Sequence, residues 1–284
     1  MQYSRFIEKK RHGSLDFPIQ YYHLDKSHPQ YIMTAHWHKE FEFIRVLRGA
    51  FKVFLNNVEY TLKNGDILVI ESGCLHRGEP LDCIYECVVF DLNMMTDKQS
   101  NAAHRFISPF LNSEAYINCI LIHEDEEIAL LTNTLFDTMK KKQPYYELSV
   151  YSLLFSIFAC LYSENKVNTS TKPPHSPQAK TITELLDWIK NNFTDAITLK
   201  TLSELSGLNE KYLCRIFKEY TSKTIIEYIN ELRVENACYE ISQKKKSITH
   251  AAFDSGFNDL SYFCKIFKKY KGITPNQYKK IVAQ

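Results

Sequence analysis

Two stretches of this chain repeat one pattern, and the repeat limits the folds that the C-terminal part can adopt. Residues 212–220 read YLCRIFKEY and residues 262–270 read YFCKIFKKY. A repeat at this spacing indicates two copies of one supersecondary unit. Gly207 and Gly256 precede the two copies, each after a short helical segment. A short helix, a glycine turn and a basic amphipathic helix are typical of a helix-turn-helix, and a plain helical hairpin is the alternative interpretation.

Helix-start signals surround both copies of the repeat. Thr224 and Thr274 are each followed three residues later by Glu or Gln, which predicts a capping box at two further helices. The helix after Thr224 is expected to run to about Ser242 and to join the two motifs. Pro275 suits the first turn of the closing helix, and Asn258 or Asp259 caps the second basic helix. At about 27 Å, the joining helix would let one chain reach two adjacent major grooves.

The two basic helices each have an apolar face at helical spacing, and the rest of each helix is free to face DNA. The apolar positions are Leu213, Ile216 and Phe217 in the first copy and Phe263, Ile266 and Phe267 in the second. The predicted DNA-facing residues are Lys211, Cys214, Arg215 and Lys218, with Leu260, Ser261, Cys264, Lys265 and Lys268. Arg215 is the expected base reader because guanidinium matches the two acceptors of guanine, and a phosphate contact is its alternative role.

The segment with these features resembles the DNA-binding domain of the AraC/XylS transcriptional regulators. The resemblance rests on Gly256-Phe257, Tyr262-Phe263, Phe267-Lys268-Lys269, Gly272 and Thr274-Pro275 to Tyr278. It implies base contacts from Lys211, Cys214 and Arg215, and from Leu260, Ser261, Cys264 and Lys265. This chain departs from the pattern at Ala251-Ala252, at Lys279 and at Ser222, which replaces the usual glycine after the first basic helix. The last departure is expected to alter that turn.

Composition favours a two-domain globular protein of the cytoplasm. The 284 residues carry a net charge of only +2, but residues 181–284 hold 16 Lys and Arg against 12 Asp and Glu. The eight cysteines form no CxxC pair, which indicates reduced thiols rather than a disulfide framework. The longest apolar run, residues 153–161, is too short to span a bilayer, and the start lacks an apolar signal core. No membrane partner is expected.

The first part of the chain reads as short strands. Residues 32–55, 58–62, 67–70 and 85–90 are rich in β-branched and aromatic residues, with turn residues such as Asn56-Asn57 between them. Such strands predict a sandwich or a barrel. With its histidines, the region resembles the two motifs of the cupin barrel, which AraC-type regulators often carry as their effector domain. The expected fold class is therefore α+β, with a cupin-like barrel, helices, and an all-α domain of two helix-turn-helix motifs.

Polar residues of the expected barrel are candidates for an effector site. A two-residue period places His36, His38 and Glu42 on one strand face, and the resemblance adds His76 from the second motif. In metal-binding cupins these four positions are the ligands. Glu71 and Gln30 depart from the cupin motifs, so we expect no metal and no cofactor, and we expect the four residues to contact the effector. Two further effector contacts are predicted, at Tyr22 and Tyr85.

Helices and a linker are predicted between the strands and the repeat. Residues 125–164 show helical spacing, and Leu148 to Leu161 is apolar on much of its surface, so it must pack on the barrel or on a second chain. The family resemblance favours a homodimer through this helix. Residues 165–178 are polar with three prolines, as in a linker, and Thr181 starts the next domain. The expected boundaries are residues 1–164, linker 165–180, and residues 181–284.

These observations lead to one predicted function and one rival. The chain is predicted to be a ligand-responsive, sequence-specific regulator that binds double-stranded promoter DNA. The family resemblance implies that the effector is a sugar or related metabolite, and that the protein, as an activator, would also contact RNA polymerase. We expect no enzymatic activity. The rival is a metal-dependent cupin enzyme, of the dioxygenase or isomerase type, with a DNA-binding tail. A barrel that binds no ligand is the third possibility.

Overall fold

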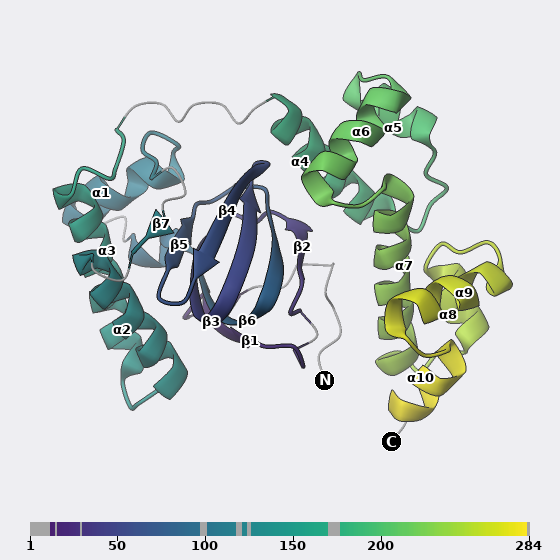
Figure 1. Ribbon diagram of the computed structural model, residues 1–284, viewed down its shortest axis with the longest axis horizontal. Helices are drawn as coiled ribbons and strands as arrows, with labels where there is room; N and C mark the ends of the chain where they lie inside the picture. Colours follow the sequence, from purple (N-terminus) through teal and green to yellow (C-terminus); the bar gives the residue numbers. More distant parts are fainter. Residues whose placement is uncertain are drawn as a thin grey trace. The chain divides into compact units, whose positions relative to one another are not determined.

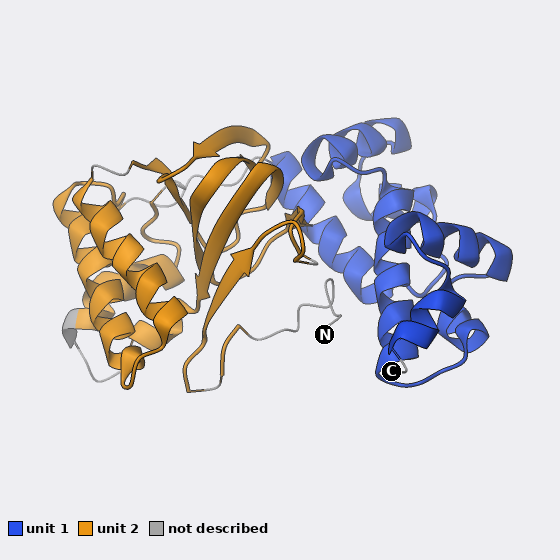
Figure 2. Cartoon of the chain, turned by 60° about the horizontal axis from the view of Figure 1, so that its bottom comes forward, with its two compact units in different colours: residues 1–10, 177–284 blue, residues 11–176 orange. Residues whose placement is uncertain are grey.

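The computed structural model describes residues 12–14, 16–28, 30–96, 101–117, 121–123, 126–169 and 177–282. The described residues divide into two compact units, one within residues 11–176 and the other within residues 177–284, and each unit is described by itself (Figure 2). The first unit is rich in strands and the second is helical (Figure 1). The predicted fold class is therefore confirmed. Residues 170–176, in the middle of the predicted linker, lie outside the described residues.

A seven-stranded antiparallel sheet forms most of the first unit. The hydrogen-bonded order is β1-β6-β3-β5-β7, with β2 paired to β6 and β4 paired to β3. Two strands of 15 residues, β3 and β6, carry most of the pairing because each contacts several shorter strands. The strand bounds are Ile19–Leu24 (β1), Met33–His36 (β2), Phe41–Leu55 (β3), Val58–Lys63 (β4), Ile67–Ile70 (β5), His76–Phe90 (β6) and Leu121–Ile122 (β7).

The expected strand over residues 32–55 is two strands in the structure. β2 ends at His36 and β3 begins at Phe41, so a short connection interrupts the predicted run. The prediction was wrong here because aromatic and β-branched residues continue across the connection and hide it. The predicted hairpin at Asn56 and Asn57 is confirmed, since both residues have positive φ, 46° and 72°, as a tight turn between β3 and β4 requires.

The sheet has two buried faces, which alternate along each strand. Ile44 and Val46 of β3 pack into one cluster with Tyr85 and Cys87 of β6, and this cluster is the barrel interior. Residues of the opposite parity pack into a second cluster with the helices that follow the sheet (Figure 1). Those helices are α1 (Asn101–Leu111), α2 (Glu127–Lys141) and α3 (Tyr146–Ser163), and a short 3-10 helix spans Leu92–Met95.

The helix α3 is apolar on both sides, and only one side is buried in this unit. Val150, Leu154 and Ile157 have no exposed surface and belong to the helix-side core. Leu148 is 72% exposed, and Phe155 is 39% exposed. By length and mean hydropathy this helix could also cross a membrane, but a core helix of a globular domain passes the same test, and part of α3 is such a helix.

The second unit is built around one long helix. The helices are α4 (Pro177–Asn192), α5 (Leu199–Ser206), α6 (Glu210–Thr221), α7 (Ile225–Ser242), α8 (Ile248–Asp254), α9 (Leu260–Lys271) and α10 (Pro275–Val282). The pairs α5–α6 and α8–α9 are the two predicted helix-turn-helix motifs, and α7 joins them as expected (Figure 1). Phe263 and Phe267 are fully buried in a core that α7, α8 and α10 share.

Local signals placed most of these helix ends correctly. Thr224 and Glu227 form the predicted capping box, and the side chain of Asp259 caps α9. Ser222 takes the left-handed conformation with φ of 60°, so the turn that glycine usually makes is preserved. The start predicted at Thr181 was wrong. Because α4 begins at Pro177, Thr181 lies inside the helix and its hydroxyl donates to the Pro177 carbonyl.

Candidate DNA-binding surface and barrel site

The helix α6 presents polar residues on the side opposite its buried face. Leu213, Ile216 and Phe217 are buried, and the predicted DNA-facing residues lie outside this face. Of these, Lys211, Arg215 and Lys218 are exposed, while Cys214 is half-buried. Asn209 caps the helix by accepting from the backbone N–H of Tyr212 at 2.9 Å, which fixes the first turn.

The Arg215 side chain is held loosely along α6. Its guanidinium lies 3.3 Å from Glu219 Oε2, one turn later, and 4.9 Å from the centre of the Tyr212 ring. The arginine side chain is 63% exposed, so this ion pair contributes little to stability. The guanidinium can therefore leave Glu219 and bind an acceptor on another molecule with little loss of free energy.

The helix α9 repeats this arrangement. Leu260, Ser261 and Lys265 are exposed in its first half, as is Lys268, while Cys264 is half-buried like its counterpart in α6. The side-chain amide of Asn230, on α7, donates to the Tyr262 hydroxyl at 2.9 Å and so links α9 to the central helix. Sequence reasoning assigned no role to this pair, because the two residues lie 32 positions apart.

Glycine is required at the turn that sets up the second motif. Gly256 has φ of +88°, and a Cβ atom at this position would lie 2.6 Å from the Thr194 carbonyl oxygen. The backbone of the segment after α4 therefore packs directly on this turn. The equivalent Gly207 also has positive φ, but a Cβ atom there would have no neighbouring atom within 4 Å among the described residues. The two glycine turns therefore share one backbone conformation, but only the turn at Gly256 is closely packed against another segment.

In the first unit, the structure brings the side chains of His36, His38, Glu42 and His76 together. One ligand atom of each lies within 4.8 Å of the others. His36 ends β2 and pairs with His76 at the start of β6, while His38 lies in the connection before β3. The expectation that alternation along one strand would align the first three residues was wrong. They converge because the chain turns between β2 and β3.

The polar contacts of this His-Glu cluster are well defined. His38 Nε2 and His76 Nε2 both lie 3.2 Å from Glu42 Oε2. The side chains of His38, Glu42 and His76 are only 7%, 4% and 0% exposed. Burial alone would raise the pKa of Glu42, but hydrogen bonds and charge interactions with His38 and His76 outweigh it and hold that pKa well below its usual range.

The two predicted tyrosines differ in their surroundings. Tyr85 is fully buried, its ring stacks on Phe51 at 4.2 Å, and its hydroxyl donates to the Tyr31 carbonyl oxygen at 2.8 Å. Its hydroxyl is thus engaged with the backbone, and its main role is in the core. Tyr22 lies nearer the cluster through His12, whose Nδ1 is 3.0 Å from the tyrosine hydroxyl.

His12 is a site residue that sequence reasoning missed. It is 6% exposed, and its ring centre lies 5.9 Å from that of His38. Nothing in the surrounding sequence signals this position, because His12 precedes the first strand and matches neither motif. The His-Glu cluster therefore has a fourth imidazole ring beside it.

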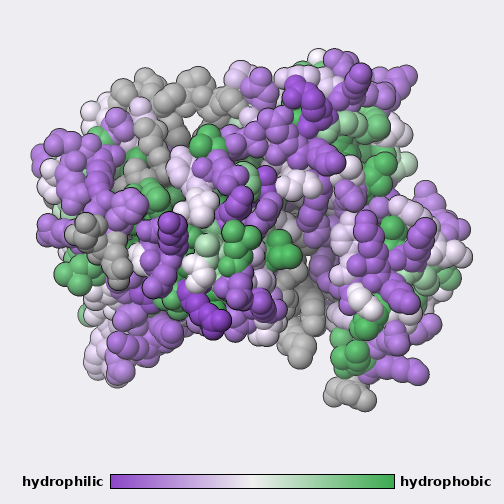
Figure 3. Space-filling view, viewed as in Figure 1, coloured by the Kyte–Doolittle hydropathy of each residue, from purple (hydrophilic) through white to green (hydrophobic). Residues whose placement is uncertain are grey.

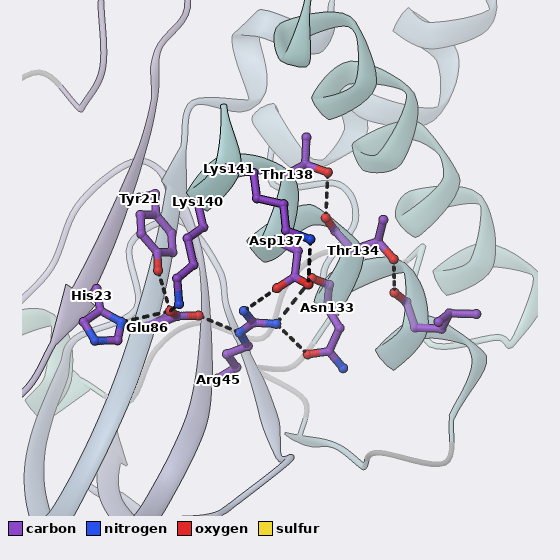
Figure 4. Close-up of polar contacts among 11 residues, drawn as sticks. Tyr21, His23, Arg45, Glu86, Asn133, Thr134, Asp137, Thr138, Lys140 and Lys141 are labelled. Carbon is purple, nitrogen blue, oxygen red and sulfur yellow. Dashed lines mark hydrogen bonds and ion pairs between the residues drawn. The ribbon is translucent and has the colours of Figure 1, made fainter. Parts of the chain in front are cut away.

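A second polar cluster lies on the opposite face of the sheet, against α2 (Figure 4). The Glu86 side chain has no exposed surface, and Arg45 Nε donates to its carboxylate at 2.7 Å. The same guanidinium donates to Asp137 at 2.8 Å and to the Asn133 side chain at 3.0 Å. Arg45 has the opposite strand parity to Glu42 in β3, so it points away from the barrel interior, and its contacts tie the sheet to the helix.

Three more side chains surround the Glu86 carboxylate. The Tyr21 hydroxyl donates to it, His23 Nδ1 lies at 2.9 Å, and Lys140 Nζ lies at 3.3 Å. Burial alone would raise the pKa of Glu86, but the hydrogen bonds from Tyr21, His23 and Arg45 hold it below its usual value. A charged Glu86 is therefore part of the folded unit at neutral pH.

Comparison with known proteins agrees with both units. Residues 18–158 match the family model of an AraC-like ligand binding domain, and residues 202–281 match a helix-turn-helix domain model. With two helix-turn-helix motifs after a ligand-binding barrel domain, the protein is a DNA-binding transcriptional regulator. The chain belongs to the AraC family of these regulators.

Several relatives match along most of their length. The chain is 23% identical to the uncharacterized HTH-type transcriptional regulator YdeC of Bacillus subtilis, over 96% of each chain. It is 26% identical to the HTH-type transcriptional activator RhaS of Mannheimia succiniciproducens, covering 89% of this chain and 92% of that one. It is 25% identical to the melibiose operon regulatory protein of Escherichia coli, covering 90% and 86%. A ToxT structure from Vibrio cholerae aligns over 95% and 99%, at 14% identity and a TM-score of 0.45.

Proposed function

We propose that this protein is a cytoplasmic, ligand-responsive activator of genes for carbohydrate or related metabolite use. The observation that carries the proposal is the pair of exposed basic helices, α6 and α9, set on one central helix in a chain that also has a polar barrel site. Binding of an effector changes transcription only if the effector favours one arrangement of the chain over another. As an activator, the protein would also contact RNA polymerase.

Each basic helix is proposed to enter a major groove of the promoter. In α6 the proposed contacts are Lys211, Cys214, Arg215 and Lys218, and in α9 they are Leu260, Ser261, Cys264, Lys265 and Lys268. N-terminal residues of a recognition helix reach base edges, and lysines further along contact phosphates. The two half-buried thiols offer small apolar contacts for a thymine methyl group. Of the residues described, Arg215 is the best suited to guanine.

The effector is proposed to bind in the barrel beside the His-Glu cluster. The imidazole and carboxylate groups of His36, His38, Glu42 and His76 can donate to or accept from a polyol, with Tyr22 as a further contact. A sugar is the proposed class, supported by the melibiose operon regulatory protein among the relatives. The Tyr85 hydroxyl, which bonds to the backbone, is proposed to shape the pocket.

A homodimer is proposed through the exposed side of α3. Leu148 and Tyr145 are 72% and 81% exposed, and Leu130 of the neighbouring α2 is 69% exposed. A second copy of the same face would cover these side chains in a two-fold arrangement. Figure 3 shows that hydrophilic residues dominate the face seen in Figure 1, with hydrophobic groups scattered among them, as is normal for a protein surface.

A mobility-shift titration tests the proposed function. Wild type, Arg215→Ala and the control Lys180→Ala would be compared on the promoter of the neighbouring operon at one fixed salt concentration, because phosphate contacts make affinity salt-dependent. We expect specific binding that Arg215→Ala weakens by about 1 to 3 kcal/mol and that Lys180→Ala preserves. A chain that binds no promoter fragment, with or without candidate sugars, would refute the proposal and favour the cupin-enzyme alternative.

A further inference from the structure

The segment between α4 and α5 connects the two halves of the second unit. It follows α4 and therefore belongs to the first half, α4 to α6, whereas α8 to α10 form the second half. The backbone of Thr194 in this segment lies directly against the turn of the second motif. A Cβ atom on Gly256 would be 2.6 Å from the Thr194 carbonyl oxygen and 2.8 Å from the Thr194 Cα atom. The two halves are therefore in backbone contact here, in addition to their connection through α7.

One arginine of α7 holds this segment in place. Arg233 donates from Nε to the Phe193 carbonyl oxygen at 2.7 Å and from Nη2 to the Asp195 carbonyl oxygen at 2.7 Å. Hydrogen bonds from a charged donor are roughly twice as strong as neutral ones, and the planar guanidinium fixes the direction of both. The backbone of Thr194, between these two residues, is thus held against the glycine turn of the second motif.

The same side of α7 also contacts the second motif. Asn236, three residues after Arg233, donates from its side-chain amide to the Ser255 hydroxyl at 3.1 Å, and Ser255 has no exposed surface. The guanidinium of Arg233 lies 5.9 Å from the centre of the Phe257 ring, which follows the glycine turn. Because residues three apart lie on one face of a helix, a single face of α7 holds both the segment after α4 and the turn of the second motif.

This joint contact bears on the distance between α6 and α9, which lie in different halves. One helix, α7, connects the halves in sequence, and the contact at residues 193–195 resists a rotation of one half about that helix. DNA presents successive major grooves at a fixed rise and rotation, about 34 Å for one turn of 10 to 10.5 bp. Two helices that are fixed relative to each other match one spacing of half-sites and lose affinity at any other spacing.

We propose that Arg233 is a positioning residue for operator recognition. By holding residues 193–195 against the turn of the second motif, it fixes the separation of α6 and α9 and so the spacing of half-sites that the protein accepts. The inference rests on the proposed binding of two successive grooves by one chain. Arg233 acts here through the backbone of the first half and needs no contact with DNA. Its removal therefore changes the tolerance for spacing, whereas removal of a base contact changes affinity alone.

Operator variants test the inference in the full chain. Affinity would be measured by mobility shift on the promoter fragment that the wild type binds, and on derivatives with one or two base pairs inserted between the half-sites. One inserted base pair moves the second half-site by about 3.4 Å and turns it by about 35°. Wild type should lose roughly tenfold or more in affinity on this insertion. In Arg233→Met the ratio of the two affinities should fall by about fivefold or more. Arg233→Lys, which keeps the charge but not the paired donors, should be intermediate.

Two matched variants separate positioning from other effects. Arg215→Ala should weaken binding to every fragment and leave the affinity ratio unchanged, because it removes a proposed base contact. Lys223→Met removes an ion pair with Glu231 of α7, next to the first half, and should keep the wild-type ratio. An unchanged ratio in Arg233→Met, or an equal change in Lys223→Met, would overturn the inference.

A measurement without DNA tests the Arg233 contact separately. Cys214 of α6 and Cys264 of α9 occupy equivalent positions of the repeat, and the other described cysteines are buried. In a Cys119→Ser background, nitroxide labels on these two thiols report the distance between the helices by double electron–electron resonance. We expect one narrow distance distribution with Arg233 and a broader or shifted one with Arg233→Met.

Circular dichroism checks that the labelled chains are folded, and Arg233→Lys replaces Arg233→Met if the latter does not fold. Equal distance distributions with and without Arg233 would overturn the inference. Absence of promoter binding, with a distribution that broadens in the Arg233 variant, would refute the proposed function and leave the Arg233 contact established. The two proposals can therefore fail independently.

Discussion

Removal of Arg45 should destabilise the first unit far more than removal of a surface cation. Arg45→Met keeps an unbranched apolar side chain of similar length but deletes every polar contact of the guanidinium. The lost partners are Glu86 at 2.7 Å, Asp137 at 2.8 Å and Asn133 at 3.0 Å. The Arg45 and Glu86 side chains are 9% and 0% exposed, so the remaining carboxylate stays buried after the change.

The magnitude follows from this burial. Deleting one partner of a buried pair costs about 3–5 kcal/mol because the other charge is left uncompensated. Tyr21, His23 and Lys140 remain around Glu86 and lower the loss to the bottom of this range. We therefore expect a loss of about 3 kcal/mol. Lys52→Met is the matched control, since its ion pair with Glu59 is 36% and 47% exposed and should contribute at most about 1 kcal/mol.

The two tryptophans make the assay specific for this unit. Trp37 lies in the first unit and Trp188 in the second, and the chain has no others. In a Trp188→Phe background, tryptophan fluorescence during urea unfolding reports the first unit in the full chain. An Arg45→Met midpoint no lower than that of Lys52→Met would refute the view that the Arg45–Glu86 pair ties the sheet to α2.

The remaining predictions concern acid stability and the DNA-binding unit. The lowered pKa of Glu86 stabilises the fold above the usual value of 4.5, and this stability is lost as pH falls through the folded pKa. The difference in unfolding free energy between wild type and Arg45→Met should thus shrink as urea melts move from about pH 6 to about pH 3, and a constant difference would contradict this. An alanine in the left-handed conformation lowers the free energy of unfolding by roughly 1–2 kcal/mol. Gly256→Ala should cost more than this because its Cβ atom would clash with backbone atoms, whereas Gly207→Ala should cost only this amount. Urea melts followed by the fluorescence of Trp188 measure both losses. Lys268→Ala should reduce the salt dependence of promoter binding by about one phosphate contact, and an unchanged slope would exclude that contact.

Sequence patterns predicted the second unit in detail because its signals are local. Caps such as Thr224 and Asp259 act within one helical turn, and the apolar spacing in α6 and α9 directly marks the buried face. The start of α4 was misplaced because a Thr followed by Glu also occurs inside helices. The apolar spacing marks contacts within the chain. It therefore does not predict which exposed residues of these helices contact DNA.

The first unit was predicted less completely, because its contacts join distant parts of the chain. Glu86 and Arg45 are 41 positions apart, and neither lies in a recognisable motif. The four members of the His-Glu cluster were found from motif resemblance, yet the turn that brings them together was hidden within one continuous β-forming stretch. The sequence could not predict His12 as a site residue, since its position beside Tyr22 and His38 depends on tertiary contacts of the segment before β1.

A hydroxyl-radical footprint on the promoter tests the central claim most directly, namely that two helices on one chain bind two successive grooves. Wild type should protect two tracts about one helical turn, roughly 10 bp, apart on one face of the DNA. Arg215→Ala should weaken the tract bound by α6, and Lys265→Ala should weaken the other. A single protected tract, or equal loss of both tracts in each variant, would contradict the account.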